Sequence, residues 1–323
     1  MGDAAYTYAV ARVRAKEVFL LSDADIEQII TLKTEENCLS FLREKGWGTG
    51  DYKESADDML SAQLKKTWEE AKDLVNDTSI FDVLMIPKEY HNLKAAIKQV
   101  LANEKVDNIY YEDTKINPEQ LKAMVEKRKF DALPKEMAEV AEFAVETLLH
   151  TRDGQLCDII IDKATLEAIE RIAETTSSSF IKEYALEVVR VANIRTAVRS
   201  AKTGKSRSFM EKAMTRCEGL DIKSLMAAAE KGVDSVCDYL DGIGMNELVE
   251  AIRTSPSAFE RWCDNKIMDT IMSQKSNSFS EGPILAYIMA KENEIKTVRV
   301  ILTGKANELD DDFIRERVRK MYV

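Results

Sequence analysis

The chain of 323 residues is long enough for one large domain or for roughly two or three ordinary ones. Aromatic residues make up 7% of it, and 12 glycines and 5 prolines are few, so the composition favours an all-α fold over a sandwich or barrel. The 46 Lys and Arg against 57 Asp and Glu give a net charge of −11, which repels polyphosphate backbones and argues against nucleic acid as a partner.

Cysteine usage and hydropathy indicate where the chain resides. Five cysteines occur and none forms a C-x-x-C pair, which predicts buried thiols in a reducing compartment. No apolar run approaches the ~20 residues needed to span a bilayer. The opening M-G-D-A-A-Y-T-Y lacks the basic and apolar regions of a signal peptide. We therefore expect a soluble, cytoplasmic chain with no direct insertion into a bilayer.

Several helix boundaries can be read along the chain. Helix starts are predicted at Ser22, Asn117, Ser208 and Ser255, where a capping side chain is followed by an acid or amide, or by proline. The β-branched segment 158–162 is interpreted as a loop or a helix entry. Gly204 and Gly304 follow periodic segments, so each is predicted to end a helix with a positive φ.

Two long helices with apolar stripes stand out. The first stripe comprises Phe180, Tyr184, Val188, Val191, Ile194 and Val198. The second helix runs from Pro283 to about Leu302, with a stripe of Ile284, Ile288, Ile295, Val298 and Leu302. Spacings of three, four and seven residues are typical of a helix face that packs on a core. Strand-like alternation is essentially absent from the sequence.

The second half of each long helix is repeated along the chain. The segment N-I-R-T-A-V-R-S-A-K-T-G-K at 193–205 is similar to N-E-I-K-T-V-R-V-I-L-T-G-K at 293–305, and a shorter match, N-L-K-A-A-I-K, lies at 92–98. The offsets of 101 and 100 residues predict three helical units, 1–110, 111–210 and 211–323. Units of this size exceed solenoid repeats, so we expect discrete subdomains in a quasi-symmetric arrangement.

Each repeated segment carries two basic residues on one helix face. The pairs are Lys94 with Lys98, Arg195 with Arg199, and Lys296 with Arg299. Any one pair is explained by a solvated face with partners on the same helix, such as Glu292 four residues before Lys296. Recurrence in three units supports a second hypothesis, in which the three faces converge on one acidic or helical partner.

Motifs of catalysis and ligand binding are not found. T-G-K-S at 203–206 lacks the earlier glycine and the preceding strand of a phosphate loop, which predicts a helix C-cap. His91 and His150 have no metal-ligand or triad pattern around them. The acids Asp310–Asp312 are too few for a calcium loop and precede an expected helix. We therefore expect no cofactor, no metal and no catalytic residue, and a binding or mechanical role.

The two ends of the chain resemble a known family. The opening YTYAVARVRAKEVFLLSDADIEQII and the ending AKENEIKTVRVILTGKANELDDDFIRERVRKMYV are similar to those of the C subunit of prokaryotic V-type (archaeal-type) rotary ATPases, a relative of the d subunit of eukaryotic V-ATPases. The resemblance extends over the full length, and the pattern E-x-E-I-K-x-x-R-x-I-x-x-G-K at 292–305 is its most specific part.

The resemblance implies a non-catalytic, all-helical, funnel-like socket with pseudo-threefold symmetry. Such a socket sits on the cytoplasmic face of the membrane proteolipid ring, receives the central shaft, and passes torque between the two during ATP hydrolysis or synthesis. From their threefold recurrence we hypothesise that the six basic residues line the wall that faces the shaft. The polar stretches 46–50 and 273–280 are candidates for contact with the ring and are equally explained as ordinary surface connections. The sequence does not distinguish H⁺ from Na⁺ transport.

Two other classes of function remain open at this stage. A cytoplasmic helical adaptor that binds partner helices or peptides between its subdomains would also be soluble, helical and poor in motifs. An enzyme with an unfamiliar helical site would require a pocket with strongly shifted titratable groups. Copurification with a membrane ring and a long shaft distinguishes the rotary subunit from the adaptor.

Overall fold

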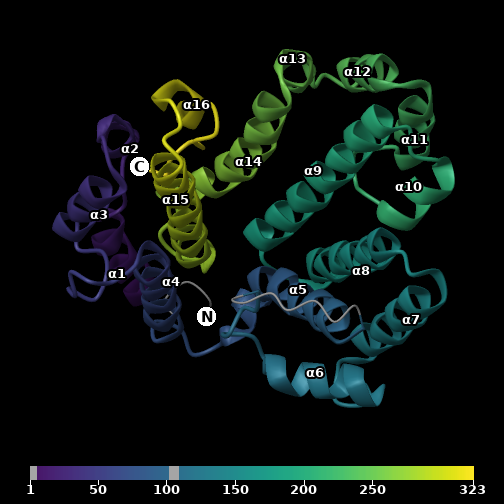
Figure 1. Ribbon diagram of the computed structural model, residues 1–323, viewed down its shortest axis with the longest axis horizontal. Helices are drawn as coiled ribbons and strands as arrows, with labels where there is room; N and C mark the ends of the chain where they lie inside the picture. The colour runs from purple at the N-terminus through teal and green to yellow at the C-terminus, as the bar shows by residue number, and fades with distance from the viewer. Residues whose placement is uncertain (1–5, 102–108) are drawn as a thin grey trace. The chain divides into compact units, whose positions relative to one another are not determined.

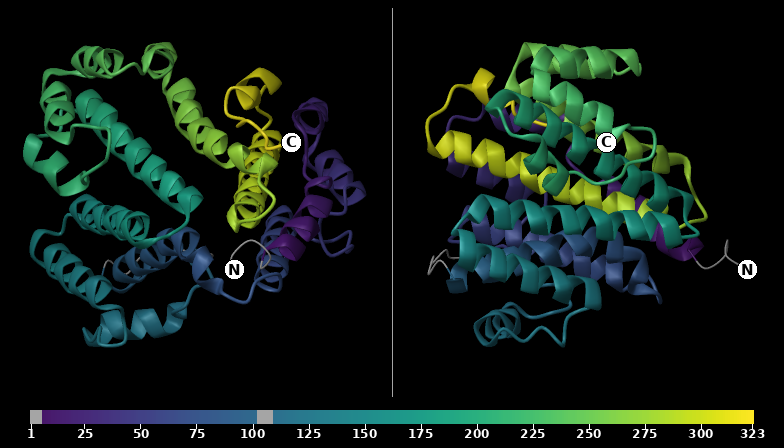
Figure 2. Two further views of the ribbon diagram at one scale, coloured as in Figure 1. Left: turned by 180° about the vertical axis from the view of Figure 1, so that it is seen from behind. Right: turned by 90° about the vertical axis from the view of Figure 1, so that its right-hand side faces the viewer.

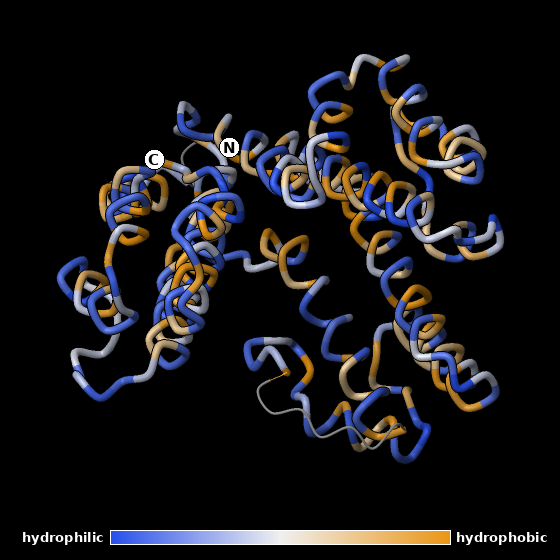
Figure 3. Tube along the Cα trace, turned by 45° about the horizontal axis from the view of Figure 1, so that its top comes forward, coloured by the Kyte–Doolittle hydropathy of each residue, from blue (hydrophilic) through white to orange (hydrophobic). Residues whose placement is uncertain are grey.

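The structure, a computed structural model, describes residues 6–101 and 109–323. Within these residues the chain forms sixteen α-helices and two short 3₁₀ helices, and no β-strand is present, so the predicted all-α class is confirmed (Figure 1). Hydrophobic and hydrophilic segments alternate along the helices, as expected where one side of a helix is in a core and the other in water (Figure 3). The chain divides into two compact units.

Unit 1 joins the two ends of the chain, Met1–Ile80 and Met245–Val323. Its first segment contains α1 (Thr7–Glu17), α2 (Asp23–Thr31), α3 (Glu35–Glu44), α4 (Ala56–Lys72) and the start of the 3₁₀ helix η1 (Thr78–Phe81). Its second segment contains α13 (Asn246–Thr254), α14 (Pro256–Met272), the 3₁₀ helix η2 (Ser273–Ser276), α15 (Gly282–Ala306) and α16 (Asp311–Arg315).

Unit 2 is the continuous segment Phe81–Gly244. It contains α5 (Asp82–Leu101), α6 (Pro118–Lys127), α7 (Lys135–Thr151), α8 (Gly154–Thr175), α9 (Ser179–Thr203), α10 (Arg207–Ala213), α11 (Ile222–Lys231) and α12 (Val233–Gly242). Helix α8 packs against α5, α7, α9 and α10, and these neighbours lie side by side in both views of Figure 2.

Helix α15 forms the centre of unit 1. It packs against α1, α3 and α4 from the first segment of the chain and against α14 from the second. The predicted stripe, Ile284, Ile288, Ile295, Val298 and Leu302, is buried throughout, which confirms that prediction. Ala286 and Thr297 are buried on the opposite side. A helix that is covered on nearly every side must be enclosed by several others, which is why both ends of the chain are needed to bury it.

A buried ion pair ties the turn between α1 and α2 to α15. The carboxylate of Glu294 lies 2.6 Å from Nζ of Lys291 and accepts a hydrogen bond of 2.7 Å from the backbone N–H of Leu21. Burial raises the pKa of Glu294, while the adjacent Lys291 opposes that rise. The Lys291 ammonium also lies 4.9 Å from the centre of the Trp47 ring, which places a cation over an aromatic face.

The core of unit 2 follows the stripe predicted for α9 and the facing sides of α5 and α8. Phe180, Val191, Ile194 and Val198 are buried, whereas Tyr184 and Val188 are half-buried. On α5 and α8, Leu93, Ile97, Cys157 and Ile161 are buried in one cluster. The apolar sides of α5 and α8 therefore share one cluster, and α9 packs against α8.

Three of the four predicted helix starts are confirmed. Ser22 forms a capping box with Asp25, Asn117 caps α6 with Pro118 at its first position, and Ser255 caps α14. The start predicted at Ser208 is wrong by two residues. The Oγ of Ser206 accepts the hydrogen bond from Phe209 N–H, because α9 ends at Gly204 and the chain turns directly into α10.

The two glycines predicted to end helices behave differently. Gly204 has a φ of +63° and caps α9, as predicted. Gly304 lies inside α15, which continues to Ala306, so the prediction of a helix end there is wrong. A Cβ atom at Gly304 would lie 2.7 Å from Cδ1 and Cγ1 of Ile314, a buried side chain of α16. Gly304 is therefore a packing position at which the chain after α15 folds back onto the helix.

The segment 158–162 is not a loop, and it does not open a helix. It lies in the second and third turns of α8, which begins at Gly154 with Asp153 as its N-cap. Its β-branched side chains are accommodated because Ile161 enters the core. Asp158 and Asp162, four residues apart, share one side of the helix.

The division into three units, 1–110, 111–210 and 211–323, stays a prediction, as does their quasi-symmetric arrangement as a funnel. In the described residues, no helix combines the length and the apolar character that a bilayer crossing requires.

The packing role of Gly304 can be tested directly. We expect Gly304→Ala to lower the free energy of unfolding by about 1–3 kcal/mol, because the added methyl overpacks Ile314, even though alanine favours the helix. Gly242→Ala is the matched control, since a Cβ there would meet no atom within 4 Å. Urea unfolding of both variants measures the difference. Equal stability of the two variants would contradict the assignment. The assignment would also be wrong if Gly304→Ala lowered the free energy of unfolding as much in a chain that carries Ile314→Ala as in the native chain.

Candidate partner-binding surfaces

The basic residues predicted on the first repeat contact acids of a neighbouring helix. Nζ of Lys94 lies 2.7 Å from Asp162, and Nζ of Lys98 lies 2.7 Å from Asp158. The two lysines are four residues apart on α5 and the two aspartates four apart on α8, so the pairs form a short antiparallel ladder between the helices. All four side chains are partly exposed to solvent.

The second and third basic pairs lie on α9 in unit 2 and on α15 in unit 1. Arg195 is half-buried and Arg199 is exposed. Both make interactions within the protein. On α15, Arg299 pairs with Asp57 of α4. Lys296 is exposed and has no ion pair in the described part of the chain.

These contacts give most of the predicted residues an intramolecular partner. Carboxylates from α8 and α4 already neutralise Lys94, Lys98 and Arg299 in the structure. Glu292, the partner considered for Lys296, accepts a hydrogen bond of 3.2 Å from the indole of Trp68. Partly exposed ion pairs contribute little to stability, so they can be exchanged for contacts with another protein at low cost. A shared partner for the six residues stays a prediction.

The repeated asparagine has a structural role that the sequence pattern alone did not reveal. Asn92 donates to the backbone oxygen of Tyr111 at 2.7 Å and accepts from the backbone N–H of the same residue at 2.9 Å. Asn193 makes the same two bonds to Thr215, at 2.9 and 3.1 Å. Asn293 donates to the backbone oxygen of Lys320 at 3.1 Å. In each case a long helix holds a segment that lies after it in the chain.

This asparagine contact accounts for part of the repeat. One side-chain amide can satisfy both the N–H and the C=O of an extended residue, which a hydrophobic side chain cannot do. Asn92 and Asn193 are buried, so the backbone groups that they satisfy have little access to water. The recurrence of asparagine at offsets of 101 and 100 residues therefore reflects a repeated packing arrangement as well as a repeated surface.

The T-G-K-S segment is a junction between two helices. Gly204 caps α9 and Ser206 caps α10. Nζ of Lys205 lies 2.8 Å from Oε1 of Gln155 and 4.9 Å from the centre of the Phe209 ring. The predicted helix C-cap is confirmed, and the lysine is engaged by its own chain.

The histidines and cysteines lie where structural roles are expected. The Nε2 atom of His91 is 2.9 Å from the backbone oxygen of Ile109, and His150 is exposed near the end of α7. All five cysteines are buried. Burial raises the pKa of Cys38 and Cys157 to about 11, which disfavours the reactive thiolate. Among the described residues, no group of three or more metal-ligating side chains could hold a metal ion.

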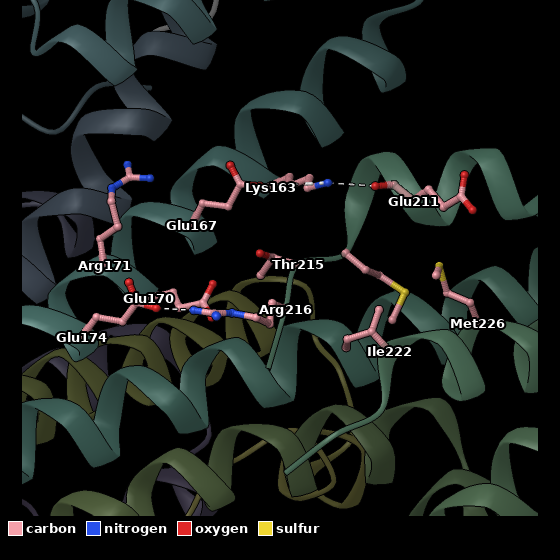
Figure 4. A pocket seen from close by; sticks show the side chains of 11 residues that line it. Lys163, Glu167, Glu170, Arg171, Glu174, Glu211, Thr215, Arg216, Ile222 and Met226 are labelled. Atoms are coloured by element: carbon pink, nitrogen blue, oxygen red, sulfur yellow. Dashed lines mark hydrogen bonds and ion pairs between the residues drawn. The ribbon is translucent and has the colours of Figure 1, made fainter. Parts of the chain in front are cut away.

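One surface pocket of unit 2 has a volume of about 450 Å³ (Figure 4). Its charged side comes from α8, from α10 and from the segment after α10, and its apolar side from Met214, Ile222 and Met226. Arg216 hydrogen-bonds to Glu170 at 2.9 Å and also pairs with Glu174. Nζ of Lys163 donates to the backbone oxygen of Glu211 at 2.9 Å.

Arg216 stays charged in this pocket. The hydrogen bond that Arg216 donates to Glu170 is the main cause that raises the pKa of Arg216 above its already high ordinary value. A general acid or base requires a group that titrates near the working pH, and a guanidinium held charged in this way does not. The pocket offers mixed charges and an apolar wall, which suit contact with a polypeptide better than catalysis.

Comparisons with known proteins match nearly the whole chain. The family model described as "ATP synthase (C/AC39) subunit" matches residues 9–317. The C subunit of the V-type sodium ATPase of Enterococcus hirae is 22% identical, over 96% of this chain and 97% of its own length. The C subunit of the A-type ATP synthase of Methanocaldococcus jannaschii is 24% identical, over 97% of this chain and 86% of its own length.

The asparagine contacts predict an order of stabilities. We expect Asn193→Ala to destabilise the protein more than Asn293→Ala. Truncation of Asn193 leaves a buried N–H and C=O of Thr215 without a hydrogen bond. Each unsatisfied group lowers the free energy of unfolding by about 1–3 kcal/mol. Asn293 is half-buried and makes one such bond, so it serves as the matched control. Chemical denaturation of the two variants measures the difference, and equal losses would contradict the proposed role.

The lysine ladder predicts a small contribution to stability. We expect Lys98→Gln to change the free energy of unfolding by less than about 1 kcal/mol, as for other partly exposed ion pairs. Ile97→Ala, the adjacent buried residue, should cost about 2–5 kcal/mol because it leaves a cavity. Denaturant titration compares them. A loss at Lys98 as large as that at Ile97 would show that the ladder is needed for folding and cannot be exchanged for a partner.

Proposed function

The chain belongs to the ATP synthase (C/AC39) subunit family, and from this premise we propose that it is a non-catalytic central-stalk subunit of a rotary V-type or A-type ATPase or ATP synthase. In this proposal it couples the central shaft to the membrane proteolipid ring, and so links ion transport to the hydrolysis or synthesis of ATP. It is a peripheral subunit on the cytoplasmic face of the membrane.

The observation that supports this proposal most strongly is the extent of the matches. The family model covers residues 9–317, and two relatives, named as the C subunits of a V-type ATPase and of an A-type ATP synthase, align over 96% and 97% of the chain. A match of this extent relates the whole chain to a whole subunit. The all-α fold without a predicted catalytic motif is compatible with a mechanical role.

Torque transmission requires contacts that resist rotation. Many charge-assisted and apolar contacts spread over a surface serve this purpose better than one tight pocket. We assign the surface that faces the shaft to Lys94, Lys98, Arg195, Arg199, Lys296 and Arg299. On three of these residues the present ion pairs are partly exposed, so exchange for carboxylates of the shaft costs little.

Contact with the proteolipid ring is assigned to polar loops. The segment 46–50 is a connection in unit 1, and 273–280 comprises η2 and the connection that follows it, in which Phe279 is 59% exposed. Exposed loops next to a rigid helical core are common sites of contact with partners. The ion that is transported is determined by the ring and not by this chain.

The proposed function predicts the outcome of a native purification. We expect the tagged full-length chain, isolated from gently solubilised membranes of its own organism, to copurify with nucleotide-binding, shaft and proteolipid subunits. Mass spectrometry of the eluate identifies them. A chain that elutes alone, or with helical partners outside any rotary ATPase, contradicts the proposal and favours an adaptor.

The basic surface predicts the effect of charge reversal. We expect the double variant Arg195→Glu, Arg199→Glu to bind the isolated shaft protein at least tenfold more weakly, equivalent to about 1.4 kcal/mol, with unchanged circular dichroism. Lys182→Glu is the control, because it reverses an exposed charge on the same helix outside the predicted set. Unchanged binding contradicts the assignment of the two arginines to the surface that faces the shaft. A loss of helicity assigns the two arginines to ion pairs needed for folding.

A further inference from the structure

Helix α1 is apolar on both of its sides. Ala9, Val10 and Val13 are buried, and α1 packs on α15. The opposite side carries Tyr8, Ala11 and Ala15, and Val18 and Phe19 follow in the turn directly after the helix. All five are exposed to solvent. The exposed fractions of Tyr8, Val18 and Phe19 are 67%, 75% and 70%. A helix at the edge of a protein ordinarily presents polar residues on its outer side, so the outer side of α1 is unusual.

We call these five exposed residues, together with Arg12, the α1 stripe. At 100° per residue, Tyr8, Ala11, Arg12 and Ala15 fall within an arc of about 100°, and at 1.5 Å per residue they extend for roughly 10 Å along the helix. Val18 and Phe19 continue the surface into the turn that follows. Single exposed apolar residues are normal on a protein surface. Three of them on one helix face, followed by two in the next turn, indicate a contact site.

The α1 stripe contains one charged side chain. Arg12 is exposed, and in the described part of the chain no residue pairs with it. The other basic residues that follow on α1 are neutralised, since Arg14 pairs with Glu17 at 2.7 Å and Lys16 with Glu70 at 2.8 Å. A lone cation within an apolar stripe calls for a carboxylate on whatever covers the stripe.

We propose that the α1 stripe is the docking face for an α-helix of another protein, whose own apolar stripe carries one carboxylate opposite Arg12. Ala11 and Ala15 are four residues apart and small, so the axis of a second helix can approach closely at this point. Tyr8 and Phe19 flank the alanines and act as apolar anchors on either side.

The charge of Arg12 favours such a partner over a second copy of this chain. In a parallel or antiparallel pairing centred on Ala11 and Ala15, Arg12 of one copy would lie beside Arg12 of the other. Like charges within an interface are strongly unfavourable. The bilayer surface is also disfavoured, because the stripe has a single basic residue and the chain has a net charge of −11.

The size of the α1 stripe limits the affinity that it can supply. One helix face of this length buries less surface than a stable interface of about 1,600 Å². The stripe therefore acts as one part of a larger contact, and single substitutions in it should weaken the association without abolishing it. This inference concerns a surface outside the six basic residues and goes beyond the proposed function.

The occupant can be captured with a photoreactive residue. We expect p-benzoylphenylalanine placed at Ala15 of the full-length chain, in its native cell, to form an adduct with one other protein on irradiation. The crosslinked peptide should map to a helix with a carboxylate within one turn of the linked residue. The control position is Ala306, which is exposed and helical in the same unit. No adduct above the Ala306 level, or adducts with a second copy or with lipid, would overturn the proposal.

Charge reversal tests the role assigned to Arg12. We expect Arg12→Glu to lower the yield of the Ala15 adduct about tenfold, and replacement of the partner's carboxylate by lysine to restore it. Lys33→Glu, an exposed reversal in the same unit without an ion pair in the described residues, should leave the yield unchanged. Thermal unfolding checks that both variants are folded. An unchanged yield with Arg12→Glu, or no rescue, refutes the carboxylate partner.

The two proposals fail in different ways. If the chain copurifies with a rotary ATPase but Ala15 gives no adduct, the docking face is wrong and the proposed function stands. If Ala15 links to a helix of a protein outside any rotary ATPase and the chain does not copurify with one, the docking face stands and the proposed function is wrong.

Discussion

The burial of α15 is the constraint on which the rest of unit 1 depends. This helix is covered on nearly every side, and helices from before and after it in the chain supply the cover. Hydrogen bonds also join α15 to the N-terminal segment of the chain. Glu294 accepts one from the backbone N–H of Leu21, and Glu292 accepts one from the indole of Trp68. Because α15 cannot be solvated without exposing a long apolar surface, the N-terminal and C-terminal segments of the chain must fold together.

A second constraint acts on the repeated segments. Asn92, Asn193 and Asn293 each hold a later part of the chain against a long helix. Most of the basic residues that follow them in the sequence lie on other sides of the same helices, and Lys296, three residues after Asn293, lies on the same side. One short segment therefore combines an internal contact, which positions the chain after the helix, with a charged surface that a partner can use. This combination explains how a segment can be similar at three places for reasons of packing and still be suited to binding.

Charged side chains on one helix are paired with opposite charges on a neighbouring helix. The ladder of Lys94 and Lys98 with Asp162 and Asp158 neutralises positions that the sequence marked as candidates for binding. The α1 stripe shows the opposite situation, an apolar surface with one charge that its own chain does not neutralise. Both kinds of surface are those that we propose for contact with other polypeptides.

The sequence by itself determined the elements whose cause is local. The all-α class follows from composition, the apolar stripes of α9 and α15 from helical periodicity, and the caps at Ser22, Asn117 and Ser255 from side chains that bond to backbone a few residues away. The full-length resemblance to the family was also legible in the sequence alone. What only the tertiary structure decided depends on residues far apart in the chain. Gly304 is glycine because Ile314 packs on it, and Lys94 finds its acid 68 residues later, on a helix that the segment 158–162 did not reveal. The exposed side of α1 likewise became distinct only once α15 covered the other side, because periodicity assigns apolar residues to a helix face but does not say which face is left in water.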